Sequence, residues 1–308
     1  MTTRRGLHVV EPGLLTTVQD LGREGWASFG VPAAGALDEE ALRLANRLVG
    51  NAEGSAALEI TLIGPVVRAA GDLDLAVVGG SFGPAPGRVL RLEDGEVVSL
   101  AAAPGTARAI VAIGGGIDVA LILGSRSTCL SGRFGGFEGR RLQAGDFLAV
   151  FPASASPLEE ARVDLPQPGE GGVVLRAFAG PDEAEFDAGA RAVFWGTTWK
   201  ILPQSNRMGL RLGGPSLGHV ETASRATEGT TRGTVQVTAH GHPIVLLAER
   251  PVTGGYPKIA VVAAVDLGLL TRTPPGSGVR FERISPTEAR SLLAAREARL
   301  RALIGART

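Results

Sequence analysis

Residues 109–116 read AIVAIGGG, five apolar residues followed by three glycines. A short run rich in β-branched residues and ended by glycine is typical of a β-strand that enters a turn. The pattern recurs, with strand-like runs ending in Gly, Pro or Asp about every 8 to 12 residues. It predicts further strands at residues 73–78, 173–178, 233–237, 244–248 and 278–282. The chain is therefore predicted to be mainly β with a few helices, as in barrels and sandwiches.

Two segments have the periodicity of an amphipathic helix. Leucines and alanines recur at spacings of three and four in residues 38–49, and Asp38 is suited to cap that helix. A second helix is predicted at residues 286–304, with Ser285 as its cap and a leucine stripe that could dock on a barrel or on a partner.

Residues 152–172 are rich in proline and glycine and lack a clear apolar period. Such a composition is typical of a connector between domains. We therefore expect an N-terminal β-barrel-like domain over residues 1–165 and a C-terminal domain, with the C-terminal helix, over residues 166–308.

Composition excludes several classes of protein. The 308 residues include 31 basic and 31 acidic side chains, so the chain lacks the excess of cations that a nucleic-acid surface requires. The single cysteine, Cys129, permits neither an internal disulfide nor a CxxC zinc cluster. No run of 18 apolar residues occurs, and the N-terminus lacks the apolar core of a signal peptide. We expect a cytoplasmic protein with no nucleic-acid or membrane partner.

Three polar side chains, Gln19, Asp20 and Arg23, lie close together in a glycine-rich stretch near the N-terminus. They either pin a turn through an Asp20–Arg23 pair or line a polar groove that binds a ligand. A second glycine-rich stretch, residues 114–128, follows a predicted strand, but it lacks the GxGxxG spacing of a dinucleotide-binding loop. It is predicted to be a turn, with an anion-binding nest as the alternative.

Arg207 and Arg211 are four residues apart, so a helix or a strand would place them on one side. Two converging guanidiniums can hold a carboxylate or phosphate bidentately. The alternative is two surface salt bridges.

The densest polar stretch runs from Glu228 to Lys258 and holds the only tyrosine of the chain, Tyr256. The backbone N–H groups of Gly254 and Gly255 could form an oxyanion hole, while Tyr256 and Lys258 could orient or protonate a substrate. Four further side chains are candidates for substrate binding: Glu228, Gln236, His242 and Thr253. The alternative is a hairpin turn with a packed tyrosine.

His240 and His242 would face one side of a strand, as two ligands of a metal site do. The surrounding sequence offers no third ligand at a suitable spacing, so we predict no metal site.

Ordered motifs along nearly the whole chain resemble one family. They are VQDLGR…GVP…GALD…AN.LVGN…ALE.T..GP (residues 18–65), GGG…LGSRST (114–128), RMG.RL.G (207–213), EG...GT.QV (228–237) and TGGYPKIA (253–260). This ordered set resembles the biotin-dependent carboxyltransferase family, KipA-like, also called allophanate hydrolase subunit 2.

The resemblance implies two cyclophilin-like β-barrel domains. In a bacterial branch, the C subunit of 5-oxoprolinase, it implies ATP-dependent opening of 5-oxoproline to glutamate with a KipI-like B subunit, and with a LamB/YcsF-like A subunit. The active-site cleft would be shared with the KipI-like partner, and the chain alone would be inactive. In the urea amidolyase branch the same region is half of a carboxyltransferase that uses biotin carried by another protein. A third member type is a regulator that binds a KipI-like partner without catalysis.

The chain departs from the family pattern at several positions near the predicted site. His242 stands where the family usually has Gln, and Glu249 and Pro251 alter the usual DRQTTGGYP stretch. Arg272 replaces a usual Gln near the last strand. Either these changes alter substrate preference, or the side chains lie behind those that contact the substrate.

Overall fold

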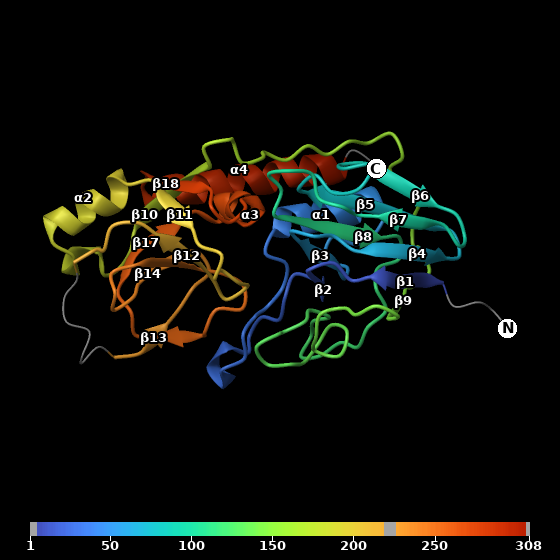
Figure 1. The fold of residues 1–308 in the computed structure, drawn as a ribbon, viewed down its shortest axis with the longest axis horizontal. Coiled ribbons are helices and arrows are strands. Elements are labelled where there is room, and N and C mark those ends of the chain that lie inside the picture. Colours follow the sequence, from blue (N-terminus) through green and yellow to red (C-terminus); the bar gives the residue numbers. More distant parts are fainter. Residues whose placement is uncertain (1–4, 219–225, 306–308) are drawn as a thin grey trace. The chain divides into compact units, whose positions relative to one another are not determined.

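The computed structural model of the protein describes residues 5–218 and 226–305. The chain divides into two compact units (Figure 1). The first comprises residues 1–26 and 33–167, and the second comprises residues 27–32 and 168–308. The division falls within the proline- and glycine-rich connector, although the short segment 27–32 carries no sequence signal that assigns it to the second unit.

The first unit is built from two antiparallel sheets. Their orders are β2-β3-β8-β5-β6 and β7-β4-β1-β9. The strands are β1 (Gly6–Glu11), β2 (Leu15–Gln19), β3 (Ala57–Thr61), β4 (Val66–Ala70), β5 (Leu73–Gly79), β6 (Val89–Leu92), β7 (Val97–Ser99), β8 (Arg108–Ile113) and β9 (Phe147–Ala149). Fully buried side chains from both sheets, among them Leu7, Ile60 and Val111, form one apolar core. The strands predicted at residues 73–78 and 109–113 are confirmed as β5 and β8.

The helix α1 (Glu39–Leu48) packs against β5 and β8. The Asp38 carboxylate caps it by accepting the Ala41 N–H at 3.0 Å, and Gly50 follows its end with a φ of +76°. A positive φ is readily adopted by glycine and strained for most other residues, so Gly50 suits the helix end. The predicted helix at residues 38–49 is confirmed.

The second unit contains a closed seven-stranded barrel of order β10-β17-β14-β15-β12-β11-β18. Its strands are β10 (Val173–Ala179), β11 (Trp199–Ile201), β12 (Gly209–Gly213), β14 (Thr234–Val237), β15 (Pro243–Leu246), β17 (Lys258–Val262) and β18 (Gly278–Arg283). The parallel pairing of β10 with β18 closes the barrel. The second unit also contains a two-stranded ribbon, in which β13 (Glu228–Gly229) pairs with β16 (Thr253–Gly254). The mainly-β fold class is therefore confirmed.

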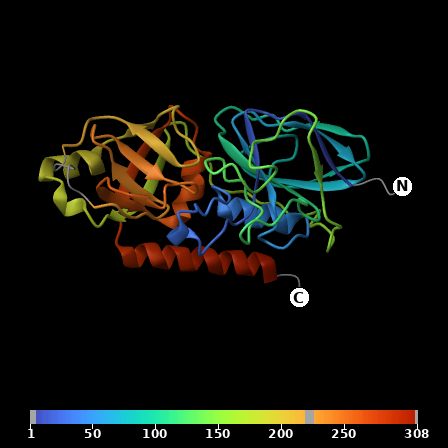
Figure 2. The same cartoon turned by 90° about the horizontal axis from the view of Figure 1, so that it is seen from below.

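Three α-helices belong to the second unit: α2 (Ala188–Gly196), α3 (Leu267–Arg272) and α4 (Pro286–Gly305). Short 3-10 turns lie at Ala27–Phe29, Glu183–Glu185 and Ala264–Asp266. The predicted C-terminal helix is confirmed as α4, which Figure 2 shows as one uninterrupted helix. The sequence does not predict α2 and α3, because their nine and six residues are too few to show a helical period clearly.

No helix within residues 5–218 and 226–305 combines the length and apolar character needed to cross a membrane.

Candidate functional site

Lys258 occupies the first position of β17, and its ammonium lies between two carboxylates. The Nζ atom donates to Glu228 Oε2 at 2.7 Å and lies 3.8 Å from Asp182 Oδ2. The backbone N–H of Lys258 also donates to Asp182 Oδ2, at 2.8 Å. The Lys258 side chain is 6% exposed and that of Glu228 is 54% exposed. The ammonium is therefore held by a buried carboxylate on one side and by a solvent-accessible one on the other.

Gln236 lies beside this lysine, as does the turn that holds Gly254 and Gly255, which we call the glycine turn. Strand pairing places Gln236 opposite Lys258 and Glu228 opposite Gly254. The Gln236 amide donates to the Tyr256 carbonyl at 3.4 Å. A Cβ atom on Gly254 would lie only 2.8 Å from Gln236 Nε2, so glycine allows the close approach of this amide.

These contacts join residues that are far apart in the sequence. We call the following set the Lys258 cluster: Asp182, Glu228, Gln236, Thr253, Gly254, Gly255, Tyr256 and Lys258. Tyr256 is 42% exposed, so its ring is accessible rather than packed in the core. The cluster offers a cation, an amide and an exposed phenol at one end of the barrel, which are groups suited to binding a polar substrate. The predicted oxyanion hole at Gly254 and Gly255 stays a prediction.

His242 is exposed in the turn between β14 and β15. Its backbone N–H donates to Thr238 Oγ1 at 3.3 Å. The N–H of Val237, where this turn begins, donates to the Pro257 carbonyl at 3.0 Å. The His242 turn and the glycine turn therefore leave the same end of the barrel, and substrate binding by His242 stays a prediction.

Arg207 and Arg211 lie in different environments. Arg207 Nε donates to Glu249 Oε1 at 2.7 Å, and both side chains are only 2% exposed. Arg211 is exposed on β12. β12 begins at Gly209, so Arg207 lies before the strand, in a turn where Asn206 Oδ1 accepts the Met208 N–H. The rule that alternate side chains of a strand share one face therefore does not apply to Arg207 and Arg211. Arg207 therefore has a buried carboxylate as its partner, and the roles predicted for both arginines stay predictions.

Gln19, Asp20 and Arg23 belong to the first unit, where they are buried together with the second glycine-rich stretch. The Asp20 carboxylate accepts the N–H groups of Gly22 and Arg126 and the hydroxyls of Ser125 and Ser127. Arg23 donates to the Ser127 carbonyl, and Gln19 donates to the Thr128 carbonyl at 3.2 Å. We call these residues the Asp20 cluster.

These contacts give the Asp20 cluster a structural role through Gly22, Ser125, Arg126 and Ser127, while the predicted Asp20–Arg23 pair stays a prediction. Asp20 is 8% exposed and Gln19 is fully buried, so neither presents an open polar surface in this unit. Glycines fit closely around the cluster, since a Cβ atom on Gly135 would lie 2.3 Å from the Ser127 carbonyl oxygen. The carboxylate therefore ties two loops together, and substrate binding by these three residues stays a prediction.

Sequence reasoning missed Asp182 and Glu249 as partners of predicted site residues. Asp182 follows a predicted strand in a Gly-Pro-Asp turn, a place where polar side chains are often positioned at a strand end. In the sequence Glu249 stands out only as a departure from the family pattern. The pairing of Ser125 and Ser127 with Asp20 is long-range in sequence, so no local signal could have found it.

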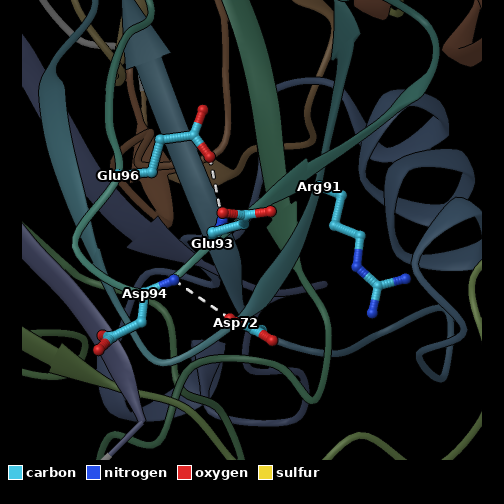
Figure 3. A pocket seen from close by; sticks show the side chains of 5 residues that line it. All are labelled: Asp72, Arg91, Glu93, Asp94 and Glu96. Carbon is cyan, nitrogen blue, oxygen red and sulfur yellow. Dashed lines mark hydrogen bonds between the residues drawn. The ribbon is translucent and has the colours of Figure 1, made fainter.

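A pocket in the first unit is lined by Asp72, Arg91, Glu93, Asp94 and Glu96 (Figure 3). Two of its carboxylates accept backbone N–H groups within the pocket: Glu96 accepts the Glu93 N–H at 3.0 Å, and Asp72 accepts the Asp94 N–H at 3.1 Å. These contacts are those of acidic residues that stabilise tight turns. Among the described residues, no group of three or more His, Cys, Asp and Glu side chains is arranged to hold a metal ion.

The chain is similar to known proteins along most of its length. A family model described as the carboxyltransferase domain, subdomain A and B, matches residues 29–283. The 5-oxoprolinase C subunit of Escherichia coli K12 is 37% identical over 290 residues, which are 92% of this chain and 93% of that protein. Urea amidolyase of Lachancea kluyveri is 32% identical over 327 residues, which cover 96% of this chain but only 18% of that protein.

The solved structure of the K. lactis urea amidolyase superimposes with a TM-score of 0.89 at 30% identity. The match covers 97% of this chain and 20% of that chain, so the present protein corresponds to one part of a much longer enzyme. The chain therefore belongs to the family of the carboxyltransferase domain, subdomains A and B.

Proposed function

We propose that this protein is the C subunit of a cytoplasmic, ATP-dependent 5-oxoprolinase complex that opens 5-oxoproline to glutamate. The observation that carries the proposal is the 37% identity to the Escherichia coli protein, which extends over 92% of this chain and 93% of that protein. The Haemophilus influenzae 5-oxoprolinase C subunit is 33% identical, with 90% of both chains covered. Similarity over most of the length of both 5-oxoprolinase C subunits supports this role.

The Lys258 cluster suits the chemistry of the proposed reaction. When the lactam of 5-oxoproline opens, water adds its oxygen to the carbonyl carbon, the C–N bond breaks and the ring nitrogen leaves as an amine. Negative charge develops on the carbonyl oxygen during this step, so fixed cationic or N–H donors would stabilise it. Lys258 and the Gly254–Gly255 backbone are the donors that we assign to this charge, and Tyr256 is the group that we assign to proton delivery.

ATP would be used by the complex, and we assign no ATP contact to this chain. The proposed partners are a KipI-like protein, which would complete the active site as the B subunit, and a LamB/YcsF-like protein as the A subunit. We therefore expect the chain alone to show no turnover.

The test is reconstitution of the complex. The purified chain is incubated with 5-oxoproline and ATP, with and without the KipI-like and LamB/YcsF-like partners, and the release of glutamate is followed. We expect glutamate only when all three proteins are present. A correctly assembled complex that releases no glutamate would contradict the proposal.

A second candidate function is favoured by the structural match to urea amidolyase at a TM-score of 0.89. In this alternative the chain is half of a carboxyltransferase that passes a carboxyl group from biotin to urea or a related amide. The only methionines are Met1 and Met208, so the chain has no Ala-Met-Lys-Met site for biotin attachment, and biotin would come from another protein. Carboxylation of urea by the chain with a KipI-like partner and a biotinylated carrier, with no glutamate formed from 5-oxoproline, would favour this function.

A further inference from the structure

Arg207 and Glu249 form an ion pair in the interior of the second unit. Arg207 Nε lies 2.7 Å from Glu249 Oε1, and both side chains are 2% exposed. The Glu249 N–H also donates to the Arg207 carbonyl, at 3.0 Å. Burial removes both ions from water, and this cost commonly cancels the gain from their attraction. Stability alone therefore does not explain the pair, and its place in the fold indicates another role.

The pair lies where the chain leaves the barrel after β15. One backbone hydrogen bond beyond the β12–β15 pairing joins the Leu247 N–H to the Met208 carbonyl at 2.9 Å. The Arg207–Glu249 pair follows directly after this bond in both segments. Residues 250–252 then lead from the pair to β16, the second strand of the ribbon.

Thr230 fastens the segment after Glu249 to the ribbon. The Thr230 N–H donates to the Val252 carbonyl at 3.0 Å, and the Thr230 hydroxyl donates to the Pro251 carbonyl. The Thr230 carbonyl accepts the Arg250 Nε–H at 3.3 Å. All three residues that follow Glu249 thus contact Thr230, so a movement of Glu249 would also move Thr230.

Thr230 directly follows β13, the strand that carries Glu228. Glu228 Oε2 accepts the Lys258 ammonium at 2.7 Å, and strand pairing places Glu228 opposite Gly254. The Glu228 side chain is 54% exposed, so little packing holds it in place. The meeting of Glu228 with Lys258 therefore depends on where the backbone of the ribbon lies.

We infer that the Arg207–Glu249 pair positions the ribbon β13–β16 so that Glu228 meets Lys258. An ion pair suits this task, because its hydrogen bond has a defined length and direction, whereas apolar contacts are not directional. The inference gives Arg207 a positioning role in place of direct contact with the substrate. Its consequence for catalysis rests on the proposed function.

The experiment compares R207M/E249M with the native chain in the reconstituted complex. Both members of the pair become uncharged side chains of similar length, so no buried charge is left alone. We expect the thermal midpoint of the full chain to move by no more than about 5 °C. The kcat for glutamate release should fall about tenfold or more, while the KM for 5-oxoproline changes less than about twofold, because transition-state stabilisation and not substrate binding is lost.

A second readout on the free chain needs no turnover. The Thr230 amide, which donates to Val252, should exchange its hydrogen several-fold faster in R207M/E249M than in the native chain. A native complex that releases no glutamate would count against the proposed function, but it would leave this measurement of the ribbon unaffected.

The matched control is R43M/E53M, which makes the same two substitutions in an ion pair of the first unit. It should keep the native kcat and the native exchange of Thr230. E249D, which keeps the carboxylate, is expected to retain kcat to within about threefold.

The inference is overturned if Thr230 exchange in R207M/E249M is native, or if an active complex keeps its native kcat with this variant. It is also overturned if R43M/E53M changes both quantities as much. Should R207M/E249M fail to show the native thermal transition, R207K takes its place, because lysine keeps the charge but has no Nε–H donor. Native exchange or native kcat in R207K would then overturn the inference.

Discussion

At the scale of single residues, Lys258 is the side chain on which the candidate site depends. We predict that K258M lowers glutamate release by the reconstituted complex at least about 100-fold, since it removes the cation that Glu228 and Asp182 hold in place. The matched control is K200M, because Lys200 is the other lysine of the chain and is exposed on β11. Equal turnover by K258M and K200M would show that Lys258 has only a structural role.

Asp20 is predicted to act on stability. In D20N an amide replaces a buried carboxylate that accepts four hydrogen bonds, so at least one donor would face another donor. We expect the free energy of unfolding, measured in urea, to fall by about 3 kcal/mol. The control is D164N, whose exposed pair with Arg162 should contribute little. Unchanged stability with weakened substrate binding would instead favour the ligand-binding alternative for Asp20.

These residues also show how much of a site a sequence can predict. Glu228, Gln236, Gly254 and Lys258 are brought together as expected, because strand pairing makes near neighbours of residues that belong to one local stretch. The sequence does not predict the role of Asp182, because its contact with Lys258 joins residues 76 positions apart. The periodicity of apolar residues in a sequence cannot indicate a contact between residues so far apart. Arg207 was expected beside Arg211, but a long-range carboxylate, Glu249, holds it in the interior.

At the scale of elements, the C-terminal helix α4 begins with a capping box. The Ser285 N–H donates to Glu288 Oε2 at 2.7 Å, and the Glu288 N–H donates to Ser285 Oγ at 3.2 Å. We predict that S285A destabilises the first turn of α4 by about 1 kcal/mol, seen as faster amide exchange in residues 287–291. S291A is the control, since Ser291 is exposed in the helix interior, where alanine is favoured.

The stabilisation that Glu288 contributes to the capping box is predicted to depend on pH. The hydrogen bonds from Ser285 lower the pKa of the Glu288 carboxyl in the folded state. A lowered folded-state pKa means that the stabilisation is present above the unfolded pKa and is lost as the pH falls through the folded one. E288Q removes the carboxylate that accepts the Ser285 N–H, so the difference in stability between E288Q and the native chain should shrink in acid. A difference that stays constant down to about pH 2 would contradict the role assigned to Glu288.

The elements that the sequence predicted are those with a strong local pattern. β5, β8 and α1 each carry an apolar period and clear end signals, and each lies where expected. The ribbon β13–β16 has strands of only two residues, and α2 buries only Ala190 and Phe194, so neither leaves a readable period. Tertiary packing helps to decide the position of α2, because Phe194 stacks on Phe281 at 4.8 Å between ring centroids.

At the scale of the whole molecule, the chain is two units joined by a connector that is itself fastened to the first unit. The Leu158 N–H donates to the Leu48 carbonyl at 2.7 Å, and the Gln167 amide donates to the Gly79 carbonyl at 2.6 Å. Composition predicted a connector from its prolines and glycines, but it could not show this docking, because single long-range hydrogen bonds leave no pattern in a sequence.

Gly87 is the residue that allows the connector to lie so close. The Val163 N–H donates to the Gly87 carbonyl at 2.8 Å, and a Cβ atom on Gly87 would lie 2.3 Å from the Val163 carbonyl oxygen. Both G87A and G95A place a side chain at a positive φ, +76° and +81°, which costs about 1 kcal/mol in each case. Only G87A also meets neighbouring backbone, since nothing lies within 4 Å of the Cβ position at Gly95.

We therefore predict that G87A, but not G95A, releases the connector from the first unit while both variants remain folded. The readout is limited trypsin digestion of the full chain, with the cut after Arg162 identified by mass spectrometry. The Arg162 side chain is already 56% exposed, so the rate of cleavage depends on how firmly the backbone around Val163 is held. Cleavage should be several-fold faster in G87A than in the native chain. If G95A is cut equally fast, general loss of stability explains the effect, and the contact between Gly87 and Val163 does not hold the connector.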